Sequence, residues 1–393
     1  MKSLLKRLPR LYSTLAVLLL NTVVLLLLVE LVAVVLTTLN PPATTQAETV
    51  EEFKQRMLRL SYYYTQDWAR EYWDEHMEVV DHWAYRPYTI WRTLPYNGTQ
   101  INVGEDGIRP TPDSNCGTDT YRVYVFGGST TWGYGVPDWG TISAYMQDRM
   151  ETRDVCVVNQ GELAFNSTQE LIWLIQLIES GDIPDLVIFY DGTNDVSTAG
   201  RSSTPGSHFF IENIRPVVKG SLVQDAADAP TNLLFELISQ TALCRLLSCS
   251  PEPAEPDWAY APFEPAFVDA IVDIYLKNIR IAELLGVEYG FEFYAFVQPV
   301  LPVVNRDYTE EEQVLMWNTP GNIADLFYEV YPRLASAAET DEQLFYFGNI
   351  LDEQPYPIWI DFHHLTPWGN LAIAHEITEI ILPVIDTALE TRT

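Results

Sequence analysis

The first residues that could do chemistry are two glycines and a serine at the end of an apolar run. Residues 122–126 read as a β-strand, and Gly127, Gly128 and Ser129 follow it directly. Two glycines permit a tight turn at the carboxyl end of a strand, with the serine hydroxyl exposed and its backbone N–H free to bind an anion. This pattern indicates either a serine nucleophile or an ordinary glycine-rich turn. A phosphate loop is not supported, because the lysine of a G-K-[ST] motif is missing.

A base for that serine stands near the end of the chain, just before the last predicted helix. A serine hydroxyl is a weak nucleophile near neutral pH and needs a base to take its proton. His364 can do so, while Asp361, three residues earlier, can accept from the other ring nitrogen and fix the tautomer. If His364 points inward, His363 is expected to point elsewhere. We predict no metal and no cofactor, because no third ligand stands at a recognisable spacing and His375 lies well beyond on the helix.

Two further blocks can supply hydrogen-bond donors for a developing oxyanion. Asn194, in the run DGTND at 191–195, follows a predicted strand, and its side-chain amide can donate. Gly161, in the run VNQG at 158–161, follows another, and a glycine there lets a substrate approach its backbone N–H. Each block alone is well explained as an ordinary loop. Together with the serine and the aspartate–histidine pair, they provide a nucleophile, a base, its orienting carboxylate and three donors.

Strands and helices alternate along the chain in a way that brings these blocks together. Apolar and β-branched runs predict the strands, and longer periodic segments predict the helices between them. The predicted strands are 122–126, 157–159, 185–190, 291–297 and 344–347, and the predicted helices are 142–151, 167–180, 266–285, 323–338 and 367–389. This alternation predicts an α/β fold with a parallel sheet between helix layers, in which a site forms beyond the carboxyl ends of the strands.

The order of the four blocks resembles that of the SGNH hydrolases, also called GDSL-like. The blocks are GGST, a glycine after the second strand, GTND, and DxxHLT followed by GN, and they span residues 121–376. The first block reads GGS where the family more often has GDS. The run NVGEDGIR at 102–109 also resembles the leader of anchored SGNH proteins. The resemblance implies a flavodoxin-like three-layer α/β/α fold, Ser129 as nucleophile, His364 as base, Asp361 as its orienting carboxylate, and an oxyanion hole made of Ser129, Gly161 and Asn194.

The substrate is not chosen by such a fold, because the family includes lipases, carbohydrate acetylesterases, thioesterases and some acyltransferases. We expect an extracytoplasmic serine esterase that hydrolyses an acetyl or other short acyl ester, with a carbohydrate as one candidate for the alcohol part. An O-acyltransferase acting on an extracytoplasmic polysaccharide is the second interpretation of the same residues. A non-catalytic binding protein on the same fold is the third.

An apolar stretch near the N-terminus predicts a membrane anchor. Residues 15–39 would form a helix about 37 Å long, enough to cross a hydrocarbon layer of about 30 Å. Basic residues precede it and none directly follows, so the positive-inside rule places residues 1–14 in the cytoplasm and the rest of the chain outside. A cleaved signal peptide is the alternative, but its apolar region is usually shorter.

The rest of the chain divides into a linker segment and a catalytic domain. Residues 40–100 are expected to form a linker followed by a helical stalk or cap, and residues 84–110, rich in aromatics, Asn and Gly, read as irregular structure. Residues 101–393 form the predicted hydrolase domain, with an insertion at about 197–262 that is partly helical around 233–247. The stalk and the insertion could be walls of the cleft or a lid.

Four cysteines, all beyond the apolar stretch, suggest two disulfides in an exported domain. Cys116 and Cys156 each precede a predicted strand and would meet at one edge of the sheet if those strands are neighbours. Cys244 and Cys249 are close in sequence. Four cysteines allow three pairings, and we predict 116–156 and 244–249.

The charge of the chain argues against one class of partner. The formal net charge is −31, and the first 40 residues are basic, so the predicted exported part carries the whole excess of acid. An acidic surface repels phosphate backbones, so we predict no nucleic-acid partner. The predicted partners are an acyl ester substrate and a membrane.

Overall fold

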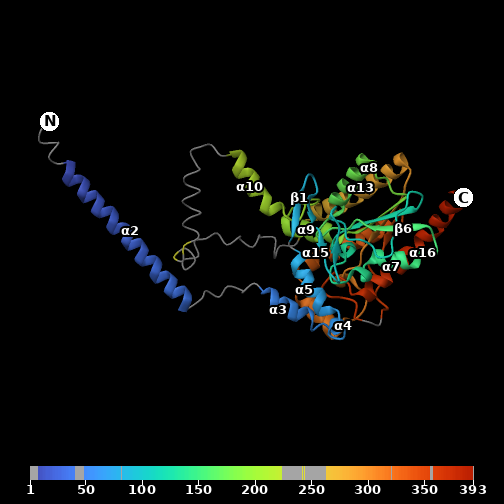
Figure 1. Cartoon of the computed structure of the whole chain (residues 1–393), viewed down its shortest axis with the longest axis horizontal. Coiled ribbons are helices and arrows are strands. Elements are labelled where there is room, and N and C mark those ends of the chain that lie inside the picture. Colours follow the sequence, from blue (N-terminus) through green and yellow to red (C-terminus); the bar gives the residue numbers. More distant parts are fainter. Residues whose placement is uncertain are drawn as a thin grey trace. The chain divides into compact units, whose positions relative to one another are not determined.

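The computed structural model describes residues 8–39, 48–80, 82–223, 241, 243, 263–319, 321–354 and 357–392 (Figure 1). The chain divides into two compact units. Met1–Glu48 and Ile214–Asp257 form one unit, and Thr49–Asn213 and Trp258–Thr393 form the other. Most of the predicted helical segment around 233–247, together with Cys244 and Cys249, lies outside the described residues.

The first unit contains one long apolar helix. Helix α2 spans Leu8–Leu39, and its stretch Ala16–Leu36 has a mean hydropathy of 2.8. Its leucines and valines are largely exposed. In the core helix of a globular domain such apolar side chains are buried against other elements. Length and composition suit either a membrane span or a signal sequence. Helix α10 spans Ile211–Val223.

The second unit is built on one parallel sheet of five strands. They are β5 (Tyr121–Gly127), β6 (Val155–Asn159), β7 (Leu186–Asp191), β8 (Glu292–Val297) and β9 (Leu344–Tyr346), in the spatial order β6-β5-β7-β8-β9. This is the flavodoxin-like order, and it confirms the predicted α/β fold with a parallel sheet. The order reverses direction between β5 and β7, so the crevice for a site is expected at their carboxyl ends.

Helices cover both faces of this sheet, and alternate residues of each strand pack against one layer or the other (Figure 1). Tyr124 and Phe126 of β5 pack in one core cluster, while Val123 and Val125 pack in the other. Because both faces are buried, most positions of the strands are apolar. The first layer consists of α8 (Ser167–Ser180), α9 (Thr193–Ser202), α13 (Pro265–Tyr289) and α15 (Gly321–Ala338); the second consists of α7 (Ile142–Arg149), α14 (Glu310–Trp317) and α16 (Pro367–Arg392).

Helix α14 (Glu310–Trp317) was not predicted from the sequence. Its start is fixed by a capping box, in which the Thr309 hydroxyl accepts from the Glu312 N–H and the Glu312 carboxylate accepts from the Thr309 N–H. Its apolar Leu315 packs on the second layer. Short helical pieces also belong to this unit: α6 (Ser129–Trp132) and the 3₁₀ turns Asp138–Gly140 and Leu301–Val303.

Residues 49–103, called the N-terminal segment below, are more ordered than predicted. Three helices come first, α3 (Val50–Met57), α4 (Ser61–Tyr64) and α5 (Ala69–Val79). Two antiparallel hairpins then replace the irregular structure expected at 84–110: β1 (Trp83–Arg86) pairs with β2 (Ile90–Thr93), and β3 (Tyr96–Asn97) pairs with β4 (Asn102–Val103).

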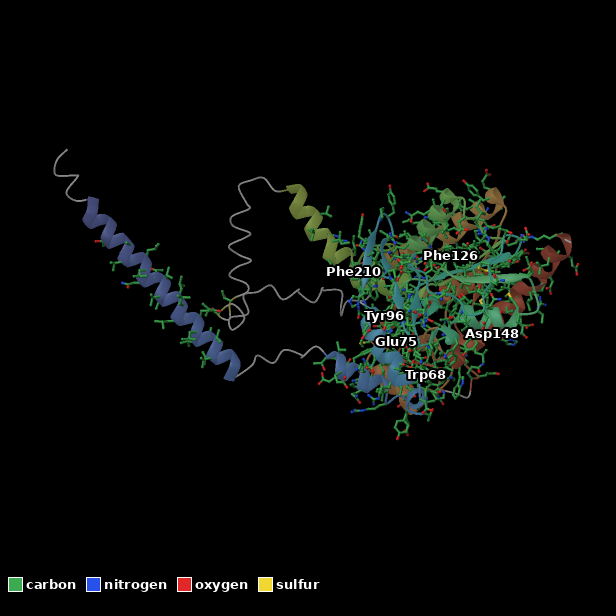
Figure 2. The ribbon with its side chains drawn as sticks, in the orientation of Figure 1. Trp68, Glu75, Tyr96, Phe126, Asp148 and Phe210 are labelled. Atoms are coloured by element: carbon green, nitrogen blue, oxygen red, sulfur yellow. A yellow bond between two sulfur atoms is a disulfide. The ribbon has the colours of Figure 1, made fainter. Side chains whose placement is uncertain are left out.

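The second hairpin is tied to helix α5 by one carboxylate. Glu75 accepts hydrogen bonds from the backbone N–H groups of Thr99, Gln100 and Ile101 at 2.7–2.9 Å, and it lies between Trp68 and Tyr96 along the segment (Figure 2). The prediction of irregular structure was wrong because these strands are too short to show a period of two, and side chains distant in sequence hold them.

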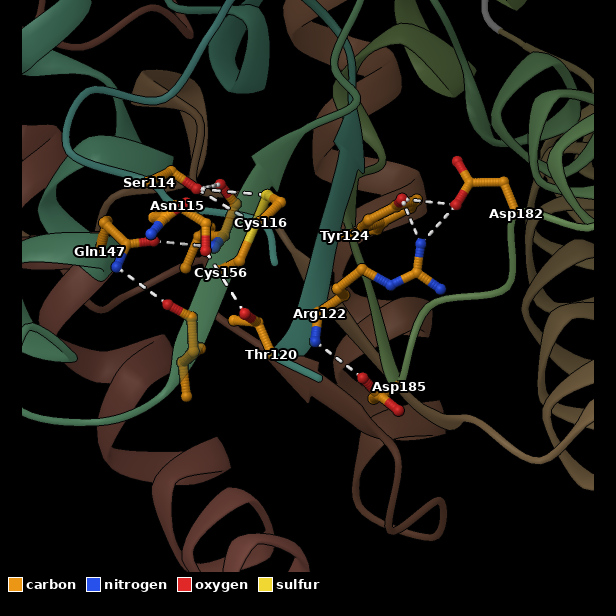
Figure 3. Close-up of a disulfide and its surroundings, with 12 residues drawn as sticks. Ser114, Asn115, Cys116, Thr120, Arg122, Tyr124, Gln147, Cys156, Asp182 and Asp185 are labelled. Carbon is orange, nitrogen blue, oxygen red and sulfur yellow. Dashed lines mark hydrogen bonds and ion pairs between the residues drawn. A yellow bond between two sulfur atoms is a disulfide. The ribbon is translucent and has the colours of Figure 1, made fainter. Parts of the chain in front are cut away.

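A disulfide joins Cys116 to Cys156 (Figure 3). Cys156 lies inside β6 rather than before it, and Cys116 lies in the loop that leads to β5. The Ser114 hydroxyl next to the bond donates to the Val157 carbonyl at 3.0 Å, which fastens the loop to the edge strand. The side-chain amide of Gln147 on α7 bonds the same strand, accepting from Val157 N–H at 2.8 Å.

Candidate active site

The serine of the first block begins a helix directly after β5. Ser129 is the first residue of α6, and Gly128 precedes it with extended backbone. A Cβ on Gly128 would lie 2.3 Å from the Asn194 side-chain nitrogen, so a glycine here lets the turn before Ser129 pack closely against Asn194. The Ser129 N–H, at the first position of a helix, has no intrahelical acceptor. The turn thus presents a hydroxyl and a backbone donor together.

Ser129, His364 and Asp361 form one continuous hydrogen-bonded chain. Ser129 Oγ lies 2.7 Å from His364 Nε2, across 235 positions of sequence. His364 Nδ1 lies 2.6 Å from Asp361 Oδ2. The second carboxylate oxygen, Oδ1, accepts from the backbone N–H of His363 at 2.9 Å and of His364 at 2.8 Å. These bonds fix the orientation of the Asp361 carboxylate. Because that carboxylate binds Nδ1 of His364, Nε2 on the other side of the ring faces Ser129.

The turn that carries the histidine is closed by backbone pairing just before α16. The Ile360 N–H donates to the His364 carbonyl at 3.1 Å, and Trp359 and Leu365 form an antiparallel bridge. Residues 361–363 are consequently looped out between paired neighbours. This short spacing explains how an aspartate three positions earlier reaches the ring nitrogen of a histidine on the same turn.

Electrostatics favour an ionised Asp361. Burial by itself raises the pKa of this carboxyl, but the His364 and His363 imidazoles and the hydrogen bonds from His364 hold it well below its ordinary value. A carboxylate in this position accepts from Nδ1–H and stabilises an imidazolium when His364 takes a proton.

His363 does not point away from the site, and the expectation that it would was wrong. Its Nδ1 lies 3.3 Å from Asp361 Oδ1, and its ring centroid is 3.8 Å from that of His364. Burial, and then the neighbouring His364, lower the pKa of His363 to about 3, so the ring is neutral near pH 7. Both imidazoles therefore lie against one carboxylate, but His364 Nδ1 is the ring nitrogen that forms a hydrogen bond with it.

The two predicted oxyanion donors lie beside the turn that carries Ser129, but both already have hydrogen-bond acceptors. The Asn194 amide, in the first turn of α9, donates to the Phe165 carbonyl at 2.7 Å and has a second hydrogen. The Gly161 N–H donates to Asn159 Oδ1 at 3.0 Å. A Cβ on Gly161 would lie 2.5 Å from Trp132 N, so this glycine packs directly on the backbone of α6.

Asn159 is a residue of the site whose role was not foreseen. Besides accepting from Gly161, it donates through Nδ2 to the Thr131 carbonyl at 2.9 Å, so it links the end of β6 to α6. Its side chain is 1% exposed. An asparagine at the carboxyl end of a predicted strand, two residues before a glycine, is the only signal that could have indicated this role.

Three buried carboxyl groups lie behind the third block. Asp191 ends β7, Asp195 lies in α9, and Glu170 lies in α8. The Tyr275 hydroxyl donates to Asp191 Oδ1 at 2.6 Å, and the Ser167 hydroxyl donates to Asp195. Burial raises the pKa of Asp191 to about 7 and that of Asp195 to about 6, and it raises the pKa of Glu170 well above its ordinary value.

In the described part of the chain, atoms that could bind a metal come together at one place, which overlaps the hydrogen-bonded chain of Ser129, His364 and Asp361. Atoms of Asp361, His363 and His364 lie within 4.8 Å of one another. The Asp361 carboxylate there already accepts from one ring nitrogen and two backbone N–H groups. The arrangement is a hydrogen-bonded chain in which the carboxylate orients the His364 ring.

Comparisons with known proteins find similar structures but no similar sequence. No family model matches the chain, and no curated protein is significantly similar to it. Similar solved structures include a lipolytic protein of the G-D-S-L family from Veillonella parvula (13% identity, 67% of this chain, 97% of that one, TM-score 0.37). They also include an acetylxylan esterase from Geobacillus stearothermophilus (12%, 68% and 95%, 0.35) and a GDSL-like lipase from Bacteroides thetaiotaomicron (13%, 70% and 89%, 0.32). The proteins from Veillonella parvula and Bacteroides thetaiotaomicron carry the G-D-S-L name.

Proposed function

We propose that the chain is a serine esterase in which Ser129 is the nucleophile, His364 the base and Asp361 its orienting carboxylate. The observation that carries the proposal is the unbroken chain of bonds from Ser129 Oγ through His364 to Asp361, at 2.7 and 2.6 Å. These distances lie within the range needed for proton transfer between a nucleophile, a base and its orienting group. Ser129, at the start of α6, and His364, in the turn before α16, meet there although their sequence separation is 235.

The proposed reaction has two steps. Ser129 Oγ attacks the ester carbonyl carbon while its proton moves to His364 Nε2, and Asp361 stabilises the resulting imidazolium. Collapse of the tetrahedral intermediate breaks the bond to the alcohol, which leaves with the proton from His364. Water then attacks the acyl-enzyme, with His364 again as base, and releases the acid and the free serine.

The oxyanion of each intermediate is held by three donors in this proposal. The Ser129 N–H and the second hydrogen of the Asn194 amide supply two of them. The Gly161 N–H supplies the third, and it must exchange its bond to Asn159 Oδ1 for one to the oxyanion. Asn159 keeps its bond to Thr131 during this exchange, so the turn stays attached to α6.

The proposed location is the outer face of a membrane. Helix α2 is long and apolar enough to span, and the basic residues that precede it favour a cytoplasmic N-terminus. The disulfide between Cys116 and Cys156 supports an oxidising compartment for the catalytic unit. The proposed substrate is an acyl ester with a short acyl group, with a carbohydrate as a candidate alcohol part.

The decisive experiment removes the Ser129 hydroxyl from the full chain purified in detergent. Ser129→Ala should lower kcat/KM for p-nitrophenyl acetate by at least about 10³-fold and abolish labelling by a fluorophosphonate probe, because the nucleophile is lost. Ser180→Ala, which removes an exposed hydroxyl at the end of α8, is the matched control and should behave like the wild type. Full activity of Ser129→Ala would refute the proposal.

A further inference from the structure

One aromatic ring outside the triad lies flat against the imidazole of His364. The ring centroids of Tyr134 and His364 are 4.1 Å apart, with an angle of 21° between the planes. Contact through the ring face leaves both ring nitrogens to Ser129 and Asp361, which they bond in the ring plane. Tyr134 therefore covers one face of the base without competing for its hydrogen bonds.

The loop that carries Tyr134 is clamped by two tyrosines of the N-terminal segment. Gly135 N–H donates to the Tyr72 hydroxyl oxygen at 2.7 Å, and the Tyr63 hydroxyl donates to the Gly135 carbonyl at 2.6 Å. Both rings are essentially buried. Both polar groups of this peptide backbone are thus fixed by side chains from helices α4 and α5.

A buried arginine holds the same loop from its other side. The Arg109 guanidinium donates to the carbonyls of Gly133 at 2.7 Å and Val136 at 2.8 Å, and its Nε donates to Asp138 Oδ1 at 2.7 Å. Arg109 is fully buried, and a planar guanidinium with several donors fixes direction as well as distance. The residues on both sides of Tyr134 consequently have their carbonyls bonded to rigid groups.

The edges of the Tyr134 ring are packed by helix α5. The His76 ring meets it edge-to-face at a centroid distance of 4.5 Å and 87°, and the Trp73 ring does so at 6.1 Å and 70°. Burial lowers the pKa of His76 to about 3, so this second histidine is neutral near pH 7 and adds no positive charge behind the base. Three layers follow in order: α5, Tyr134 and His364.

We propose that Tyr134 is a positioning residue for His364, and that the N-terminal segment exists in part to hold Tyr134 in place. The inference rests on the proposed function. A ring face against the imidazole restricts its rotation out of line with Ser129. An aromatic face also attracts a cation, so the contact strengthens when His364 becomes an imidazolium, which is the condition for raising kcat rather than lowering KM.

The test compares two replacements of the ring in the full chain. Tyr134→Leu removes the aromatic face and should lower kcat for p-nitrophenyl acetate about 10-fold, with KM within about twofold of the wild type. Tyr134→Phe keeps the face and should retain kcat within about twofold. Tyr64→Leu, the same change at a ring that is 81% exposed, is the matched control and should leave both constants unchanged.

A second variant decides the matter if Tyr134→Leu does not fold, as judged by circular dichroism and thermal melting. The double variant Tyr63→Phe/Tyr72→Phe removes both hydrogen bonds to Gly135 and keeps both buried rings. It should lower kcat about threefold with KM unchanged.

Two outcomes would overturn the inference while leaving the proposed function intact. One is a folded Tyr134→Leu chain that has the kcat of the wild type. If Tyr134→Leu does not fold, the corresponding outcome is a Tyr63→Phe/Tyr72→Phe chain that has the kcat of the wild type. The other is a change confined to KM, which would make Tyr134 a substrate-binding residue. A wild-type chain that neither hydrolyses the ester nor reacts with the fluorophosphonate would remove the proposed function, and this inference with it.

Discussion

At the scale of single residues, the two adjacent histidines show how position decides chemistry. The nitrogen that lies 2.7 Å from Ser129 Oγ belongs to His364, whereas His363 contacts the carboxylate from its other side. Both rings are near Asp361, but a base must reach the proton that it removes. Geometry therefore separates two side chains of identical chemical type.

We predict that replacing each histidine by alanine gives losses of different size. His364→Ala should lower kcat/KM for p-nitrophenyl acetate by about 10³-fold or more, since the general base is lost. His363→Ala should cost less than about 10-fold, because burial keeps that ring neutral and its removal changes no charge beside the triad. His375→Ala on the exposed side of α16 is the control. Losses of equal size at 363 and 364 would contradict the assignment.

The sequence suggests the residues proposed to react, but it does not reveal the residues that hold them in place. A serine after two glycines and an aspartate three positions before a histidine have recognisable chemistry. Asn159 and Tyr134 belong to no such recognisable pattern. They contribute to the site only because the fold places Asn159 against Gly161 and Tyr134 against His364. The occupied N–H of Gly161 likewise depends on a side-chain rotamer, which no spacing pattern encodes.

At the scale of elements, the junction of β7 and α9 contains buried carboxyl groups that no basic side chain pairs with among the described residues. Asp191 and Asp195 flank the turn that carries Asn194, and Glu170 faces them from α8. Moving a charged carboxylate out of water is costly, so these groups hold protons instead. The raised pKa values therefore come mainly from packing α8, α9 and α13 tightly around the turn.

We predict that this junction makes stability depend on pH. The folded pKa of Asp191, about 7, lies above its unfolded value of about 4, so the folded state binds more protons in between. The contribution of Asp191 to the free energy of unfolding should consequently be fully present below about pH 4 and be lost as pH rises toward 7. Asp191→Asn does not titrate, so relative to the wild type it should gain at least about 1 kcal/mol between pH 4.5 and 8.

Guanidinium unfolding at pH 4.5, 6 and 8 measures this difference. Asp273→Asn is the matched control, because Asp273 is exposed on α13 and pairs only loosely with Lys277, at 3.1 Å. It should show the pH slope of the wild type. An Asp191→Asn slope parallel to that of the wild type would show that the carboxyl titrates normally in the folded chain.

Strands and helices could be predicted where burial requires apolar residues at many consecutive positions. Strand β7 is apolar at nearly every position because helices cover both faces. The hairpin β1–β2 was missed because its turn places Tyr88 and Ile90 at φ of 67° and 75°, which local preference opposes. Contacts from elsewhere fix it, such as the bond from Trp91 Nε1 to the Leu163 carbonyl at 2.8 Å.

At the scale of the whole molecule, charge and cysteine use point to the same compartment. The chain carries a net charge of −31, while its few residues before α2 are basic. A basic flank is held in the cytoplasm during insertion, and long acidic segments cross regardless of their charge. A disulfide forms and persists on the oxidising side. The proposed orientation therefore satisfies both the flanking charges and the pair Cys116–Cys156.

We predict that this orientation can be reversed together with the redox state of the cysteines. In a bacterial host, protease added to spheroplasts should degrade the catalytic unit of the wild-type chain, and its Cys116 and Cys156 should resist alkylation unless reduced. Changing Lys2, Lys6, Arg7 and Arg10 to Gln, with a lysine cluster inserted after α2, should protect the unit and leave both thiols reactive.

Keeping the catalytic unit in the cytoplasm should also lower its free energy of unfolding, because the disulfide would not form there. The disulfide closes a loop with a sequence separation of 40, for which the chain-entropy model gives about 4 kcal/mol of stability. The inverted chain should therefore unfold at lower guanidinium concentration than the wild type, and by the same amount as Cys116→Ser in the normal orientation. A wild-type unit that is protected in spheroplasts, with free thiols, would contradict the outward orientation while leaving the triad assignment untouched.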